Sequence, residues 1–216
     1  MNKVSERMDL SHPINESLYK LLRNRVMIGV LAPGQILTLR GIAKEFNISV
    51  MPVRDAVRRL VSEGAFSMSK AGRVATPILN YERIEELFSL RALLEPELAS
   101  QALPRLHNAL LDRLATINES IEKMILERDA IGYVRTNIEF HRTLYLRAQA
   151  PATLALVETI WLQLSPSMRV LYERTHHSQA HEFHEKILVA LRNEDEPGLR
   201  YALKNDVTNG LKMLVN

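Results

Sequence analysis

The sequence contains no cysteine among its 216 residues. This absence excludes disulfide bonds, CxxC redox chemistry, thiolate metal sites and a cysteine nucleophile. No apolar run approaches the roughly 18 residues that a transmembrane helix needs. Residues 1–7 also lack the apolar core of a signal peptide. We therefore expect a soluble, cytoplasmic protein without a membrane partner.

The residues that are present are typical of a folded globular protein with two differently charged segments. Hydrophobic residues make up 46% and charged residues 25% of the chain, which excludes collagen-like and wholly disordered chains. Residues 1–77 contain 12 Lys and Arg against 6 Asp and Glu, whereas residues 78–216 contain 16 against 19. The basic first segment indicates a polyanionic partner, although chance variation in surface charge would give a similar balance.

Apolar residues in the first third of the chain recur at helical spacing in short segments. They predict three helices, over about residues 14–26, 39–46 and 53–61. Asn47 is expected to end the second helix because asparagine tolerates the left-handed conformation. Two β-type runs flank Gly72, at residues 65–69 and 74–78. Three short helices followed by a hairpin are typical of a winged helix-turn-helix.

From residue 80 onward the apolar pattern is helical throughout. Asn80, Asp129 and Asp195 each precede a helical segment and are typical N-caps. Pro104 and Pro151 are expected in the first turns of two further helices. Six helices with short connections predict an antiparallel bundle. The predicted fold is therefore mainly α, with two domains: a winged helix-turn-helix over residues 1–78 and a six-helix antiparallel bundle over residues 79–216.

The third predicted helix carries arginines away from its apolar stripe. Arg54 and Arg58 are four residues apart and share one face. An arginine early in a recognition helix can bind guanine O6 and N7, while Arg58 and Arg59 are better placed for phosphates. Further candidates for DNA contact lie at the second helix, the turn and the hairpin tip: Arg40, Ser49, Lys70, Gly72 and Arg73. The alternative is that these arginines are solvated surface residues.

The run Pro52-Val53-Arg54-Asp55-Ala56 resembles the Pro-Val-Arg-Glu-Ala sequence of GntR-type bacterial transcription regulators. The likeness spans most of residues 14–77 and implies DNA contacts by Arg40, Ser49, Arg54 and the hairpin tip. One position departs from the family, which commonly has arginine directly after the turn serine, where this chain has Val50. A valine there contacts a thymine methyl or nothing, so the base at that operator position stays open.

Three later helices carry polar residues on otherwise apolar stripes: His141, His184 and Asp206. A carboxylate on a buried stripe is costly unless it is paired or binds a metal. Two histidines and one carboxylate inside a bundle suit a divalent transition metal, with the amide oxygen of Asn137 as a fourth ligand. The alternative is ordinary hydrogen bonding in the core, in which Asp206 accepts from His184.

The segment Leu90-Arg91-Ala92-Leu93-Leu94-Glu95 resembles the start of the helical FCD domain in the FadR branch of the same family. That resemblance implies an effector-binding and dimerisation domain, in which many members hold a divalent metal with one Asp and three His residues. His141 and His184 match two of these positions, whereas Asn137 and Asp206 replace an Asp and a His. The ligand charge is unchanged, so we expect a retained metal (Zn, Ni or Mn). Arg91 is expected to anchor an effector carboxylate, or else to pair with Glu95.

Together these patterns predict a ligand-responsive bacterial transcription regulator of the repressor type. It would bind operator DNA as a homodimer and respond to a small carboxylate effector. One alternative is a metal-dependent enzyme that uses the bundle site, but no additional base or nucleophile stands near the stripes. The other is an architectural DNA-binding protein without an effector. We therefore predict that the protein is not an enzyme.

Overall fold

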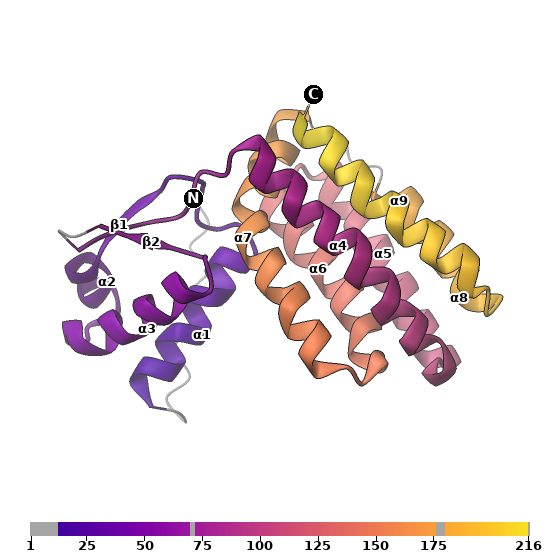
Figure 1. Cartoon of the computed structure of the whole chain (residues 1–216), viewed down its shortest axis with the longest axis horizontal. Helices are drawn as coiled ribbons and strands as arrows, with labels where there is room; N and C mark the ends of the chain where they lie inside the picture. Colours follow the sequence, from indigo (N-terminus) through magenta and orange to yellow (C-terminus); the bar gives the residue numbers. More distant parts are fainter. Residues whose placement is uncertain (1–12, 70–71, 176–179, 216) are drawn as a thin grey trace.

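The computed structural model describes residues 13–69, 72–175 and 180–215. The winged-helix unit (residues 14–75) contains three helices and a three-stranded antiparallel sheet (Figure 1). In chain order its elements are α1 (Ile14–Met27), β1 (Ile36–Thr38), α2 (Leu39–Phe46), α3 (Val50–Ser62), β2 (Ser67–Met68) and β3 (Arg73–Ala75). The sequence predicts the β2–β3 hairpin but not β1, which pairs with β3 in the register Ile36↔Ala75.

Local signals set the helix-turn-helix. The Thr38 hydroxyl oxygen accepts a 2.9 Å hydrogen bond from the Gly41 N–H at the start of α2. Asn47 adopts the left-handed conformation with φ 53° and ends that helix, as predicted. Helix α3 then buries one apolar stripe, which consists of Val53, Ala56, Val57 and Leu60. The opposite face of α3 is left exposed beside the turn.

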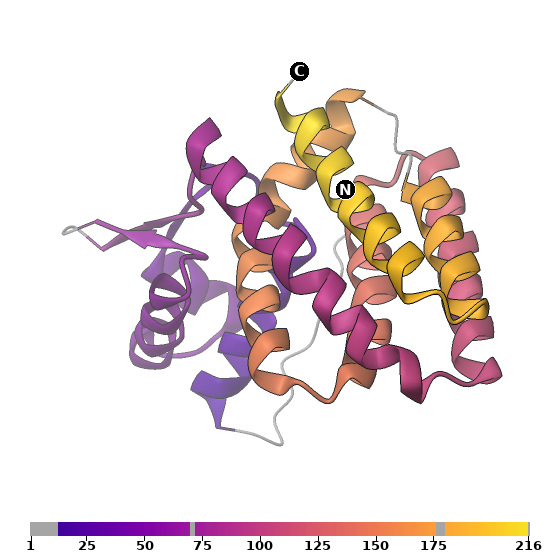
Figure 2. The same cartoon turned by 45° about the vertical axis from the view of Figure 1, so that its right-hand side comes forward.

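The bundle (residues 81–215) contains the six predicted helices, so the expectation of a mainly α fold is confirmed. They are α4 (Tyr81–Ala102), α5 (Asn108–Leu126), α6 (Ala130–Tyr145), α7 (Pro151–Thr175), α8 (Ala180–Arg192) and α9 (Glu196–Val215). Helix α9 packs along both α4 and α8 (Figures 1 and 2). Within the described residues, no helix is long and apolar enough to span a membrane.

Side-chain caps begin most of the bundle helices. Asn80, Asp129 and Asp195 each accept a backbone hydrogen bond from three residues ahead, at 3.0, 2.9 and 3.0 Å, so these predicted caps are confirmed. The prediction for Pro104 is wrong, because this residue lies in a 3₁₀ turn (Leu103–Arg105). Helix α5 begins later, where His107 Nδ1 accepts a 3.2 Å hydrogen bond from the Leu110 N–H.

The winged-helix unit docks on α7, which lies beside α1 (Figures 1 and 2). The guanidinium of Arg169 donates 3.0 and 3.1 Å hydrogen bonds to the backbone carbonyls of Gly29 and Val30. The amide of Gln163 donates to the carbonyl of Glu63 at 3.1 Å. Buried apolar residues of the two units also belong to one continuous core. Helix α7 is therefore the bundle element that orients the winged-helix unit.

Candidate DNA-binding surface and metal centre

The exposed face of α3 carries two arginines. Arg54 and Arg58 are exposed, and Arg40 and Ser49 are exposed at the starts of α2 and α3. In residues 13–69, 72–175 and 180–215, the guanidinium groups of Arg40, Arg54 and Arg58 form no ion pair. These groups are therefore available to an anionic ligand.

Arg59 differs from its neighbour Arg58. Its guanidinium lies 2.8 Å from a carboxylate oxygen of Glu16 and 3.7 Å from one of Glu63. It also stacks over the Tyr19 ring, 3.6 Å from the ring centroid. Arg59 is thus engaged inside the winged-helix unit, which leaves Arg58 as the better phosphate candidate of the two.

The tip of the hairpin and the position after the turn serine complete this surface. Gly72 has φ 75°, and nothing lies within 4 Å of the position that a Cβ would occupy; Arg73 beside it is exposed. Val50 is half-buried against the apolar core. The predicted contact residue Lys70 lies outside the described residues.

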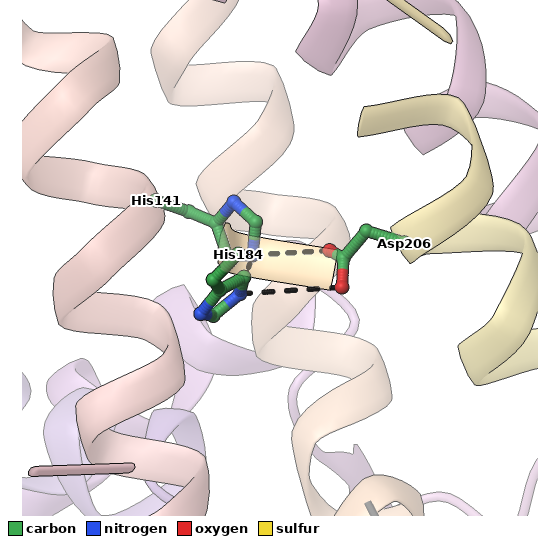
Figure 3. Close-up of side chains that lie close together, drawn as sticks. All are labelled: His141, His184 and Asp206. Atoms are coloured by element: carbon green, nitrogen blue, oxygen red, sulfur yellow. Dashed lines mark hydrogen bonds and ion pairs between the residues drawn. The ribbon is translucent and has the colours of Figure 1, made fainter. Parts of the chain in front are cut away.

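The three polar residues that interrupt apolar stripes meet inside the bundle. His141 comes from α6, His184 from α8 and Asp206 from α9 (Figure 3). The two Nε2 atoms are 3.2 Å apart, and Asp206 places its carboxylate oxygens 3.2 Å from His141 Nε2 and 4.0 Å from His184 Nε2. Ligand atoms of all three residues lie within 4.8 Å of one another. The sequence prediction that these side chains converge is confirmed.

Burial and neighbouring charge set the protonation of this group. Both histidine rings are buried, and the Asp206 side chain is 10% exposed. Burial lowers the pKa of His184 from 6.5 to about 3. Burial acts to raise the pKa of Asp206, but the hydrogen bond to His141 and the nearby cationic groups lower it overall. At neutral pH the group therefore offers a neutral imidazole and a carboxylate.

A second layer of polar residues contacts the Nδ1 atoms of the two histidines. His141 Nδ1 lies 3.1 Å from the Tyr145 hydroxyl, which donates a 2.9 Å hydrogen bond to Glu95. His184 Nδ1 lies 3.2 Å from Asn118 Oδ1. Burial raises the pKa of Tyr145 well above its ordinary value, so its hydroxyl keeps its hydrogen. Each imidazole is thus held at the nitrogen that points away from Asp206.

A cavity of about 30 Å³ adjoins His141. Its wall includes Arg91, Asn137 and Trp161, so two of the predicted site residues face the same space. The Arg91 guanidinium also donates to Glu95 at 2.5 Å, as the alternative of an intrahelical ion pair predicts. Since one water needs about 10–15 Å³ by this measure, the cavity takes about two waters and must widen for a larger ligand.

Comparison with known proteins decides the family. Residues 14–73 match the gntR family of bacterial regulatory proteins, and residues 86–209 match the FCD domain. The chain belongs to the GntR family. It is 26% identical to the HTH-type transcriptional regulator McbR of Escherichia coli over 196 residues, which cover 89% of each chain. A solved structure of E. coli McbR/YncC superposes with a TM-score of 0.88 at 25% identity, covering 94% of this chain and 98% of that one.

A second GntR-family relative is the gluconate operon transcriptional repressor of Bacillus subtilis. It is 31% identical over 147 residues, which cover 68% of this chain and 58% of that protein. Such relatives are transcriptional regulators, and this protein is likewise a bacterial GntR-family transcriptional regulator with an FCD domain, not an enzyme. The division at residues 78 and 79 stays a prediction, because the two family matches leave residues 74–85 between them.

Sequence reasoning missed Asn118 as part of the site. This amide is fully buried on α5, on a stripe that also includes Leu114, Ile117 and Ile121. It carries the same signal that identified His141 and Asp206, a polar residue at an apolar position of a GntR-family bundle helix. The signal was therefore present in the sequence, but the partner of the amide could not be read from it.

Proposed function

We propose that this protein is a ligand-responsive repressor whose bundle holds a divalent metal and a small carboxylate effector. His141, His184 and Asp206 would hold the metal, with Asn137 as a candidate fourth ligand. The observation that carries the proposal is the convergence of two imidazole nitrogens and a carboxylate beside a cavity that Arg91 also lines. An effector carboxylate in that cavity would meet both the metal and a guanidinium.

The chemistry of the donor set fits a first-row divalent ion. Imidazole nitrogen and carboxylate oxygen suit zinc, nickel or manganese, and the absence of cysteine leaves no thiolate that would favour softer ions. His184 stays neutral because burial lowers its pKa to about 3, and a neutral imidazole is the form that binds metal. When bound, the metal would supply a Lewis-acid position for a carboxylate oxygen.

The winged-helix unit supplies the DNA contacts in this proposal. Arg54 would contact a base, while Arg40 and Arg58 would contact phosphates. Ser49, Val50, Gly72 and Arg73 border the same surface, with Lys70 as a further candidate. A homodimer of the bundle would place two such surfaces on half-sites about one or more helical turns apart.

The first test measures metal directly. Purified full-length protein is analysed for metal content, stripped with EDTA, and titrated with zinc, nickel and manganese while the melting temperature is recorded. We expect at least one ion to bind near one per chain and to raise the melting temperature. His141→Ala and Asp206→Ala should lose this response, whereas Glu182→Ala, which removes an exposed carboxylate of α8, should keep it. If no ion binds wild-type protein, the metal proposal is wrong.

The second test measures repression and its relief. Binding to the upstream DNA of the protein's own gene is followed by fluorescence anisotropy at several salt concentrations. Small carboxylates are then added in order of size, from acetate to gluconate, because the cavity is small and one relative is named for the gluconate operon. We expect sequence-selective binding that one acid releases. Selective binding that no acid alters would support the architectural alternative.

A further inference from the structure

The buried amide of Asn118 has partners on both of its ends. Its Oδ1 lies 3.2 Å from His184 Nδ1. Its Nδ2 donates to the Glu185 carboxylate at 2.9 Å and to the backbone carbonyl of His181 at 3.3 Å. The residue is fully buried, so water does not replace these hydrogen bonds. Losing one of them therefore costs free energy of folding.

The chemistry of these partners fixes which way the amide points. A carboxylate and a backbone carbonyl accept hydrogen bonds and cannot donate them. The amide NH₂ must therefore face Glu185 and His181, and the amide oxygen must face His184. In the flipped orientation, the oxygen of Asn118 would oppose two acceptors inside the protein.

An amide oxygen at 3.2 Å from a ring nitrogen requires a hydrogen between them. The hydrogen has to come from His184 Nδ1, because the oxygen has none. In a neutral imidazole the other nitrogen, Nε2, then carries a lone pair. That lone pair faces His141 Nε2 at 3.2 Å and the Asp206 carboxylate at 4.0 Å.

We propose that Asn118 is a positioning residue that holds His184 as the Nδ1–H tautomer and so leaves Nε2 free to bind metal. In the other tautomer, an Nε2–H group would point at the metal position. The Tyr145 hydroxyl gives its one hydrogen to Glu95, so its contact with His141 Nδ1 requires an Nδ1–H on that ring as well. The ligand role of Nε2 rests on the proposed metal centre, whereas the tautomer itself does not.

The tautomer is measured in metal-free, full-length protein. Two-bond proton–nitrogen correlation spectra of protein with ¹⁵N-labelled histidine, at mildly alkaline pH, report which ring nitrogen is protonated. The His184 signals are assigned from their absence in His184→Gln. We expect Nδ1–H in the wild type and a loss of this preference in Asn118→Leu. An Nε2–H tautomer in the wild type, or an unchanged tautomer in Asn118→Leu, would overturn the inference. If the tautomer is as expected but no metal binds, only the metal proposal fails.

Metal affinity supplies a second readout, with zinc as the probe. Loss of a second-layer partner typically costs about 10–100-fold in affinity, and we expect a weakening of this size in Asn118→Leu. The double variant Asn118→Asp with Glu185→Gln reverses the polarity of the hydrogen bond to residue 185 and keeps an acceptor for His184 Nδ1–H. Because it loses the bond to the His181 carbonyl, it should restore part of the binding. If Asn118→Leu does not fold, the double variant must still show Nδ1–H, and Nε2–H there contradicts the proposal.

The matched control is Thr136→Val on α6. Thr136 is also buried, but its hydroxyl bonds to the Gly132 carbonyl of its own helix, away from the histidines. We expect this variant to lose some stability and to keep both the tautomer and the zinc affinity. A loss of zinc affinity in Thr136→Val equal to that in Asn118→Leu would mean that general loosening of the bundle explains both, which contradicts the proposal.

Discussion

The indole nitrogen of Trp161 donates a 2.9 Å hydrogen bond to the buried carboxylate of Glu95. Glu95 also accepts from Tyr145, whose hydroxyl contacts His141. Trp161 lines the cavity beside His141 and also a groove of about 390 Å³ between α1 and the bundle. One connected network thus reaches from the candidate metal centre to the surface on which the DNA-binding unit rests. Ile138 and Trp161 form a wall that the cavity and the groove share.

The Arg91–Glu95 pair should be the most sensitive point of this network. Glu95 is fully buried, and the Arg91 side chain is 9% exposed. Glu95→Gln leaves the Arg91 charge uncompensated in the core, so we expect the free energy of unfolding to fall by about 3–5 kcal/mol. Urea denaturation followed by circular dichroism measures this change.

Two further variants test whether the buried charge is the cause. Arg91→Leu combined with Glu95→Gln removes both charges and keeps an amide at position 95 that can bond to Trp161 and Tyr145. We expect it to recover most of the stability lost in Glu95→Gln alone. Arg200→Met breaks a comparable pair with Glu97 on the surface, where solvent screens it, and should change stability little. A double variant as unstable as Glu95→Gln would show that shape, not charge, dominates at this position.

The docking of the winged-helix unit depends on a glycine that follows α3. Gly64 has φ 73°, and a Cβ there would lie 2.8 Å from Gln163 Nε2 on α7. Gly72 has a similar φ of 75° with nothing within 4 Å. Both alanine substitutions carry a left-handed backbone cost of about 1–2 kcal/mol. We expect Gly64→Ala to be the more destabilising of the two, because it also displaces Gln163. Equal melting temperatures of the two variants would show that Gln163 on α7 moves aside without a loss of stability.

Substitutions of the three arginines of α3 should have three different effects on DNA binding. Arg54→Ala should cost about 1–3 kcal/mol of binding to the preferred operator and relax the base preference at one position. Arg58→Ala should weaken binding to all sequences and lower the salt slope by about one. Arg59→Ala is the control, because its guanidinium is engaged with Glu16 and Tyr19, and it should lower stability without changing the salt slope. Anisotropy titrations on operator and scrambled DNA separate these outcomes.

Local chemistry made most elements of the fold predictable. Asn80, Asp129 and Asp195 cap helices through their own neighbours, so a sequence window contains the whole signal. Strand β1 is different, because three residues form a strand only through pairing with β3. Pro104 does not mark the start of α5, because the cap that begins this helix is the ring of His107, an uncommon capping group.

The residues of the candidate site also divide into those that the sequence predicts and those that it does not. Periodicity alone identifies side chains that interrupt apolar stripes, as it does for His141, His184 and Asp206. Their partners could not, because Asn118 and Glu95 acquire a role only when α5 and α4 pack against helices far away in the sequence. A periodic pattern shows that a residue is buried, and tertiary structure decides what it meets.

The stability of metal-free protein should fall in acid because of His184. Burial lowers its pKa from 6.5 to about 3 in the folded state, so below pH 6.5 the unfolded chain binds a proton that the folded chain does not. The contribution of the neutral imidazole is therefore complete above its unfolded pKa and is lost as the pH falls from 6.5 toward 3. Urea midpoints across this range should fall more steeply in the wild type than in His184→Gln, which has no such proton to bind. Parallel curves for the two proteins would show that another group causes the acid sensitivity.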